Sequence, residues 1–320
     1  MLADEIIALR GGFEDRLTGG GFKELGDQIK QAQRFDLSAD VMRSARTIMQ
    51  SPLDTQLRAL NLCRLPFAET WFEWPGGFTG EAAERPWTEV PKRMGALVRC
   101  ERSLQRGSIV WAWFNRKAGF NICPLALTFD WRAEPEPLKD ITRRTDLDEA
   151  TWRRLGEQFP RARSSSREAL IEENRRFGVI MCPLTRGLMT TASIAGVSVN
   201  ILRMAEKDIE GEGPLLRAAI MLMNSRNLSE AVPRPAAVKL NRSRVKSGKA
   251  PLLDYTHIQI RLTRALGMRA AMAADPRAPS RLHLVRGHFK VRRTGVFWWS
   301  PHPRGHAERG EVNQARHVAV

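Results

Sequence analysis

The sequence predicts an α+β fold: a mainly helical body with a small antiparallel sheet and a basic C-terminal β-hairpin region. Residues 1–65 show apolar side chains at three- and four-residue spacing, which is typical of helices. Residues 65–131 alternate aromatic and β-branched runs with turn residues, which is typical of strands. Most of the excess positive charge lies after residue 230. We therefore expect a helical body over 1–230, with the sheet inserted at about 65–131, and a basic region over 231–320.

The N-terminal part predicts several short helices that end at glycine or proline. The helical segments LADEIIALRGGFEDRL and GFKELGDQIKQAQRF are interrupted by the runs GG and GGG, which end or break helices. A third helix is expected after Ser38, a suitable N-cap, and before Pro52. The segment SPLDTQLRALNLC predicts one more short helix.

The predicted sheet is rich in tryptophan. Large aromatic side chains dominate the buried area of protein cores, so we expect these tryptophans to fill the core of the sheet. They are Trp71, Trp74, Trp87, Trp111, Trp113 and, at the boundary, Trp131.

The pattern becomes helical again before residue 230. One helix is expected to begin at Ser165 or Ser166, because serine is a favourable N-cap and an acid follows in the first turn. The segment GEGPLLRAAIMLMNSRN is apolar nearly all round, which predicts a buried central helix with Pro214 near its start. The segment EAVPRPAAV predicts a hinge into the basic region.

Composition argues against several classes of protein. The longest apolar runs, such as AAIMLM, are too short to cross a bilayer, so we expect no membrane contact. Acids near the N-terminus do not fit a secretory signal. The four cysteines show no CxxC spacing and are expected to be reduced thiols in the cytoplasm. The motifs GxGxxG, GxxxxGKS/T, HExxH and GxSxG are absent from the sequence, so we expect no cofactor.

Charge is unevenly distributed along the chain. The net charge is +16, and residues 231–320 hold eighteen Lys and Arg residues against four Asp and Glu residues. Such a segregated excess is typical of proteins that bind polyanions. Because no basic helix with a strong apolar stripe stands out there, nucleic acid is favoured over a membrane surface.

The segment LNRSRVKSGKAPLLDY concentrates basic residues. One charge for every two residues fits neither a regular helix face nor a core. We interpret the segment as a flexible phosphate-binding stretch that orders on contact, with a solvated linker as the alternative. Its basic residues are Arg242, Arg244, Lys246 and Lys249.

Two stretches of the basic region predict strands. The alternation in DYTHIQIRL predicts a strand over Tyr255–Leu262, and RLHLVRGHFKVRR predicts one continuous strand. A turn at Thr294-Gly295 would pair the second strand with VFWW and would place Lys290 opposite Trp299. The outer face would then offer cations to phosphates and aromatic rings to unpaired bases. The alternative is that the cations pack on the aromatic rings of the same hairpin and stabilise it without any ligand. That face comprises Lys290, Arg292, Phe297 and Trp299.

We therefore predict contacts with DNA or RNA, in which Phe297 or Trp299 stacks on bases. The predicted phosphate contacts are Arg242, Arg244, Lys246, Lys249, Arg286, Lys290, Arg292 and Arg293.

Histidines gather near the C-terminus and raise two other possibilities. His302 and His306 are four residues apart, but Pro303 and Gly305 lie between them, so we expect no metal site. Metal-free RNA cleavage would use histidine as general acid or base and arginine to hold the phosphate charge. Whether the chain is an enzyme stays open. The catalytic candidates are His288 with Arg286, and in addition His283 and His302.

Several segments together resemble an uncharacterised group of bacteriophage and prophage proteins. The segments are RLPFAETWFEWPG, MLMNSRNLSE, KLNRSRVKSGKAPLLDY and RLHLVRGHFKVRRTGVFWWSPHPRG. The most specific motif is the closing hairpin, Val-Arg-Gly-His-Phe followed by Trp, Pro-His and Arg-Gly. The second segment departs from the group, with Met223 where leucine is expected. The resemblance implies a mobile-element origin and the cytoplasm of a bacterial host, and it implies no biochemical activity.

The predicted function is that of a nucleic-acid-binding accessory protein of a phage or prophage. Two alternatives stay open: a metal-free ribonuclease or toxin-like enzyme, and a protein-interaction module whose basic region meets an acidic protein partner.

Overall fold

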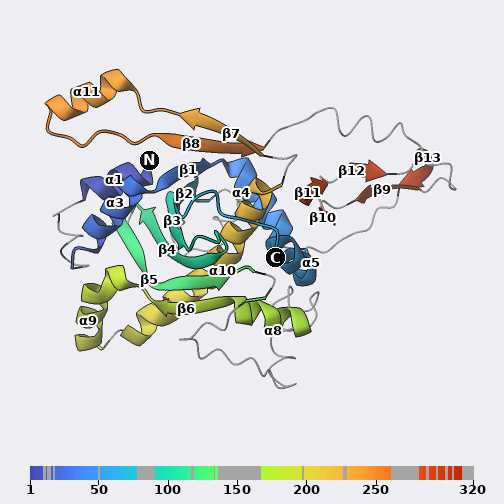
Figure 1. The fold of residues 1–320 in the computed structure, drawn as a ribbon, viewed down its shortest axis with the longest axis horizontal. Coiled ribbons are helices and arrows are strands. Elements are labelled where there is room, and N and C mark those ends of the chain that lie inside the picture. The colour runs from blue at the N-terminus through green and yellow to red at the C-terminus, as the bar shows by residue number, and fades with distance from the viewer. Residues whose placement is uncertain are drawn as a thin grey trace.

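The computed structural model describes most of the chain (Figure 1). The described residues are 1–9, 12, 16, 19–49, 51–77, 91–116, 119–132, 134–135, 167–196, 198–225, 229–260, 281–285, 288–292, 295–299, 302–304 and 306–311. The helices are α1 (Leu2–Ala8), α3 (Gly21–Gln31), α4 (Ala39–Met49), α5 (Leu53–Leu60), α8 (Arg167–Arg176), η2 (Pro183–Thr185), α9 (Arg186–Ile194), α10 (Ser198–Met223) and α11 (Val238–Lys246). The strands are β1 (Gln33–Leu37), β2 (Glu69–Pro75), β3 (Arg93–Cys100), β4 (Arg106–Asn115), β5 (Gly119–Asp130), β6 (Phe177–Met181), β7 (Ser229–Arg234), β8 (Tyr255–Ile260), β9 (Arg281–Val285), β10 (His288–Arg292), β11 (Gly295–Trp299), β12 (His302–Arg304) and β13 (His306–Glu311).

A mixed eight-stranded sheet forms the centre of the protein, in the order β6-β5-β4-β3-β2-β1-β8-β7. Strands β2 to β6 pair antiparallel with one another, whereas β1 runs parallel to both β2 and β8. The prediction of a mainly helical body with a small antiparallel sheet is therefore wrong. Strand β7 spans residue 230 and β8 lies beyond it, so the sheet contains strands from both sides of the boundary expected from the sequence.

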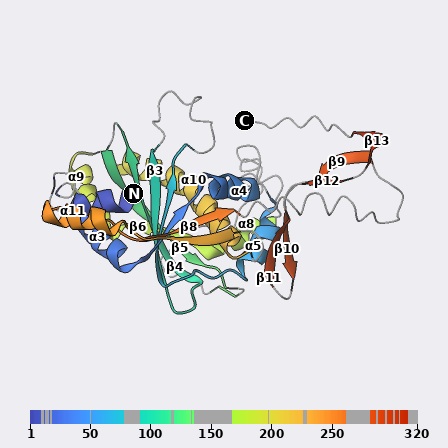
Figure 2. The ribbon, with the colours of Figure 1, turned by 90° about the horizontal axis from the view of Figure 1, so that it is seen from above.

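Helices cover both faces of this sheet (Figures 1 and 2). On one face, α4 and α10 pack on the sheet, and their apolar residues join Phe72, Trp74 and Trp111 in one core. On the other face, α1 and α3 enclose a second core around Trp71 and Leu97. Because successive residues of a strand point to opposite faces, β2 sends Trp71 into one core and Phe72 into the other.

The strands that the sequence did not predict are short or contain polar residues. Strand β1, with the sequence QRFDL, lies in the middle of the sheet, where its neighbours satisfy its backbone. Strand β7 contains Pro233 within the expected hinge, and it lies at the sheet edge, where proline is tolerated because no further strand needs its missing N–H. The strand predicted at Tyr255–Leu262 exists as β8, but it pairs with β1 and β7 rather than with the C-terminal hairpin.

The short N-terminal helices are confirmed in α3, α4 and α5. Ser38 caps α4, because its hydroxyl oxygen accepts a hydrogen bond from the Val41 N–H at 3.3 Å. The helix expected after Ser165 or Ser166 is α8. The expectation that a helix begins near Pro214 is wrong: α10 begins at Ser198, and its packing against the sheet compensates for the hydrogen bond that proline lacks.

The core position predicted for the tryptophans is confirmed for four of them. Trp71, Trp74, Trp111 and Trp131 are buried, and Trp113 is partly buried against the same core. Trp87 lies outside the described residues.

The stretch predicted as one strand after Arg281 forms two strands in different sheets. Strand β9 lies between β12 and β13 in a three-stranded sheet, whereas β10 pairs with β11. The hairpin register pairs Arg292 with Gly295 and Lys290 with Phe297, so residues 293–294 connect the strands. The prediction of a turn at Thr294-Gly295 is therefore wrong, because the connection lies one residue earlier. The predicted pairing of Lys290 with Trp299 is wrong for the same reason.

Candidate functional site

Helix α11 stands at the tip of an arm formed by β7 and β8, which pair antiparallel along their length (Figure 1). None of its residues is buried. From Val238 to Lys249 the chain carries basic side chains and no acidic one. The five basic residues are Lys239, Arg242, Arg244, Lys246 and Lys249.

The expectation of a flexible stretch at Leu240–Tyr255 is wrong over its first part, because these residues form a capped helix. Gly248 has φ +71° just beyond the helix end. The N–H of Gly248 donates to the Val245 carbonyl at 3.0 Å, and the N–H of Lys249 donates to the Arg244 carbonyl at 2.9 Å. This pair of bonds is the Schellman motif, which ends a helix at a glycine in the left-handed region.

The chain that returns from α11 to β8 holds the helix in place. The Asn241 side chain makes two hydrogen bonds with the backbone of Leu252, one of 3.0 Å as donor and one of 2.7 Å as acceptor. The Arg244 Nε donates to the Ala250 carbonyl at 2.8 Å, so this guanidinium is partly engaged, whereas Arg242, Lys246 and Lys249 are exposed.

The base of the arm is tied to the body. The Asp254 carboxylate accepts a hydrogen bond from the Ala236 N–H at 2.7 Å, and the Asp254 carbonyl accepts one from Arg34 Nε at 2.9 Å. The Leu253 N–H donates to the Asp4 carboxylate at 2.9 Å. Helix α11 is therefore presented on an arm with a fixed base.

The C-terminal hairpin contributes a second basic element. Val296 is buried in the core that contains α4 and α10. Arg292 is exposed, and its guanidinium carbon lies 5.9 Å from the centroid of the Phe297 ring. This is the intramolecular cation–π contact named above as the alternative to nucleic-acid contacts, and it leaves the Arg292 cation at the surface.

The other predicted site residues are only partly described. Arg286 and Arg293 lie outside the described residues, as do the side chains of Trp299 and of the histidine candidates. The backbone places His283 and His302 on the paired strands β9 and β12, and His288 on β10 in a separate sheet. The register pairs His302 with Val285 and His283 with Arg304.

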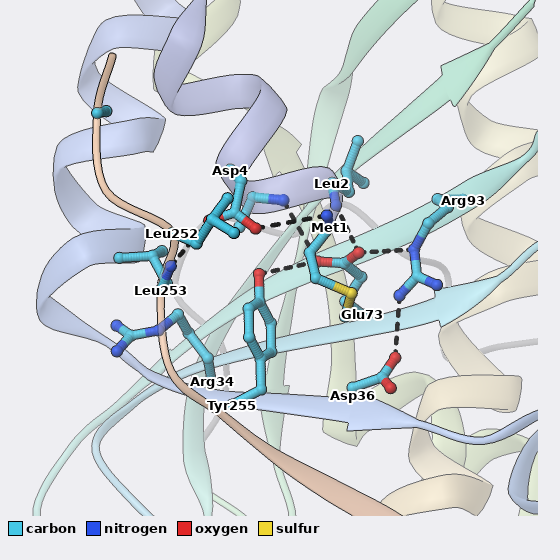
Figure 3. A network of polar contacts seen from close by, with 12 residues as sticks. Met1, Leu2, Asp4, Arg34, Asp36, Glu73, Arg93, Leu252, Leu253 and Tyr255 are labelled. Atoms are coloured by element: carbon cyan, nitrogen blue, oxygen red, sulfur yellow. Dashed lines mark hydrogen bonds and ion pairs between the residues drawn. The ribbon is translucent and has the colours of Figure 1, made fainter. Parts of the chain in front are cut away.

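A polar cluster that the sequence did not predict lies on neighbouring strands of the central sheet (Figure 3). The register places Asp36 of β1 beside Glu73 of β2 and His257 of β8, so strand pairing brings these three residues together within the sheet.

Glu73 is fully buried, and each of its oxygens has several partners. The Leu2 N–H donates to Oε1 at 2.5 Å, and Arg93 Nε lies 2.6 Å from the same oxygen in an ion pair. The other oxygen, Oε2, accepts hydrogen bonds from the Ala3 N–H at 3.3 Å, from Trp71 Nε1 at 3.3 Å and from the Tyr255 hydroxyl at 3.2 Å. These partners compensate the cost of burying a charge.

Arg93 links this buried carboxylate to a histidine. Its Nη2 donates to Asp36 Oδ1 at 2.9 Å, and Asp36 Oδ2 lies 2.8 Å from His257 Nδ1. The three side chains are between 13% and 25% exposed, so the cluster is partly accessible. A carboxylate that orients an imidazole through Nδ1 leaves Nε2 to accept or donate a proton.

Electrostatics fix the protonation of two members of the cluster. Burial lowers the pKa of Arg93, but the Glu73 and Asp36 carboxylates outweigh burial, so the pKa is raised and the guanidinium stays charged. Burial raises the pKa of the Tyr255 phenol, and the Glu73 carboxylate raises it further, so Tyr255 stays a donor. Two signals in the sequence point to this cluster: the lone acid in the aromatic run TWFEWP and the single tyrosine of the chain.

No protein-family model, no curated protein and no solved structure matches the chain.

Two structural findings bear on metals and membranes. Within the part of the chain that the structure describes, no group of three or more His, Cys, Asp and Glu side chains is arranged to hold a metal ion. Among the same residues, no helix has both the length and the apolar character needed to span a bilayer.

Proposed function

We propose that this protein is a nucleic-acid-binding accessory protein, of phage or prophage origin and acting in the cytoplasm of a bacterial host. The observation that carries the proposal is α11: an exposed, capped helix at the tip of an arm, surrounded by five basic side chains and no acidic one from Val238 to Lys249. Concentrated positive charge on a protruding element attracts the phosphate backbone independently of sequence.

The charge distribution of the whole chain supports this proposal. The region after residue 230 carries nearly all of the net charge of +16. The hairpin adds the exposed Arg292 beside Phe297, which is a pairing that also suits a phosphate next to a base. The two elements would act through different contacts, α11 on phosphates and the hairpin on phosphates and exposed bases.

A salt titration of binding tests the proposal. We expect the logarithm of the binding constant to fall linearly with the logarithm of salt concentration, because neutralised phosphates release counterions. The triple variant Lys239→Ala, Lys246→Ala, Lys249→Ala should lower the salt slope by about three. The matched control, Arg58→Ala, Arg175→Ala, Arg203→Ala, removes the same charge from exposed positions on α5, α8 and α10 and should leave the slope unchanged.

Absence of binding to any nucleic acid, or binding that does not depend on salt, would contradict the proposal. Capture of an acidic protein from nuclease-treated lysate, lost in the triple variant, would instead favour the interaction-module alternative.

A second candidate function, metal-free RNA cleavage, is favoured by one contact. His257 is held by Asp36 at 2.8 Å in the arrangement of a general base. Incubation of labelled RNA with purified protein in EDTA tests this candidate. Cleavage lost in His257→Ala supports this site, cleavage lost in His288→Ala supports the C-terminal histidines instead, and intact RNA rejects the candidate.

A further inference from the structure

We propose that α11 is a recognition helix that enters the major groove of double-stranded DNA and reads base edges there. The inference deepens the proposed function and rests on it, because it names duplex DNA as the nucleic acid and α11 as the element that gives sequence preference.

The two sides of α11 differ in what they contact. An α-helix turns by about 100° per residue, so residues three and four apart share a side. Asn241 and Arg244 lie on the side that is bonded to the returning chain at Leu252 and Ala250. The solvent-facing arc of interest consists of Arg242 and the residues three and four positions from it, which are Val238, Lys239, Val245 and Lys246; all five are exposed.

The solvent-facing arc combines cations with exposed apolar side chains. Val238 is 64% exposed and Val245 is 60% exposed. A helix that bound only phosphates would need no such apolar groups on the same face. In the major groove, an arginine can donate two hydrogen bonds to guanine, and an apolar side chain can contact the thymine methyl group. Around the helix, Arg242 lies in the middle of this arc, with the two valines on one side and Lys239 and Lys246 on the other, where the lysines can reach phosphates.

Other nucleic acids fit this helix less well. The major groove of A-form RNA is too deep and narrow for side chains to read, whereas that of B-DNA admits an α-helix. Single strands are held mainly by aromatic side chains that stack on bases, and α11 contains none. The charge, the shape and the side chains of α11 therefore all favour duplex DNA as its ligand.

The arm also prepares the helix for binding. The Schellman motif at Gly248, the Asn241 bonds to Leu252 and the Asp254 anchor order the helix before any ligand arrives. Ordering before binding reduces the conformational entropy that binding must overcome.

The test measures affinity and groove preference with the full-length protein. A duplex site is first selected from a random pool of oligonucleotides, and its affinity is compared with that of each single strand and of the same sequence as double-stranded RNA. We expect the duplex DNA to bind at least tenfold more tightly than the other forms. Methyl green, which occupies the major groove, should displace the protein, and netropsin, which occupies the minor groove, should not.

Single substitutions locate the preference on the helix. Arg242→Ala should relax the preference at a guanine position by at least about fivefold, and Val245→Ala should relax it at a thymine position. The matched control is Leu240→Ala, an exposed apolar residue of the same helix outside the solvent-facing arc, and it should leave the preference unchanged.

The outcomes separate the inference from the proposed function. Binding to no nucleic acid would remove both. Salt-dependent binding that favours single strands or RNA, that netropsin displaces, or that Arg242→Ala weakens equally for all sequences would overturn the recognition helix and leave the proposed function standing.

Discussion

The indole ring of Trp71 lies directly against the backbone of Gly95 on the neighbouring strand. A Cβ atom at Gly95 would lie 2.2 Å from Cζ2 and 2.4 Å from Cη2 of this ring, and 3.1 Å from the Leu2 side chain. Trp71 is fully buried and donates its Nε1 hydrogen to Glu73. The glycine therefore makes room for the ring that holds the buried carboxylate.

The first prediction follows from this contact. Gly95→Ala should lower the free energy of unfolding by about 3 kcal/mol, because a buried ring with a fixed hydrogen bond cannot move aside and overpacking a core is costly. Urea denaturation measures the change. The control is Gly211→Ala in α10, where a Cβ would meet nothing within 4 Å and where alanine should raise stability by up to about 1 kcal/mol. Wild-type stability of Gly95→Ala would contradict the packing described here.

The second prediction concerns the buried charge of Glu73. Glu73→Ala should lower the free energy of unfolding by about 3–5 kcal/mol, because Arg93 loses a buried counter-charge and the Tyr255 hydroxyl loses its acceptor. Lys30→Ala, which breaks an exposed ion pair with Asp27, should cost less than about 1 kcal/mol. Equal effects of the two substitutions in thermal or urea unfolding would argue against a structural role of Glu73.

The third prediction is a dependence of stability on pH. Burial, and to a smaller extent the nearby Asp208 carboxylate, raise the pKa of Glu212 to about 7. A carboxyl group whose pKa is raised by folding stabilises the folded state in its neutral form, so this contribution is complete below the ordinary pKa near 4.5 and is lost as pH rises through about 7. Its size is at most about 3 kcal/mol.

Glu212→Gln keeps a neutral side chain at every pH and should therefore flatten the loss of stability between pH 5 and pH 8. The free energy of unfolding in urea at both pH values measures this difference. Glu210→Gln, at an exposed position of the same helix, should show the wild-type profile. Parallel profiles for wild type and Glu212→Gln would refute the prediction.

The fourth prediction concerns the end of α11. Gly248→Ala introduces a side chain at φ +71° in open space, so only backbone strain opposes it, by about 1–2 kcal/mol. Amide hydrogens at Gly248 and Lys249 should exchange at least about fivefold faster, while the global free energy of unfolding stays nearly constant because no residue of α11 is buried. Gly248→Asn is the control, since asparagine tolerates this region of backbone space, and it should restore much of the protection. Unchanged exchange in Gly248→Ala would show that the Schellman motif does not hold the helix end.

Local patterns in the sequence identified much of the secondary structure. The cap at Ser38, the strands between Glu69 and Asp130 and the apolar end of α10 all depend on neighbours in the chain, and they are where the patterns place them. The size of the sheet could not be predicted in the same way. Strand β1 is stabilised by β2 and β8, which lie far from it in sequence, and its five residues QRFDL carry no alternation strong enough to predict a strand.

The candidate site shows the same division. The basic residues of α11 were recognised from composition, but the helix was not, because its cap, its bonds to Leu252 and its position on a β-arm arise from contacts across a turn of the chain. Glu73, Arg93, Asp36 and His257 could not be connected from the sequence, since strand pairing brings them together over separations of up to 221 residues.

The sequence by itself determined the segregation of charge, the tryptophan-rich core and the elements whose hydrogen bonds are local. Only the tertiary structure decided that the sheet has eight strands, that an acid and a histidine meet within it, and that the basic segment is held out as a helix. The physical reason is the sequence separation of the interacting residues. Composition and periodicity report what each residue prefers beside its neighbours in the chain. Strand pairing and buried ion pairs depend on residues that come together only when the chain folds.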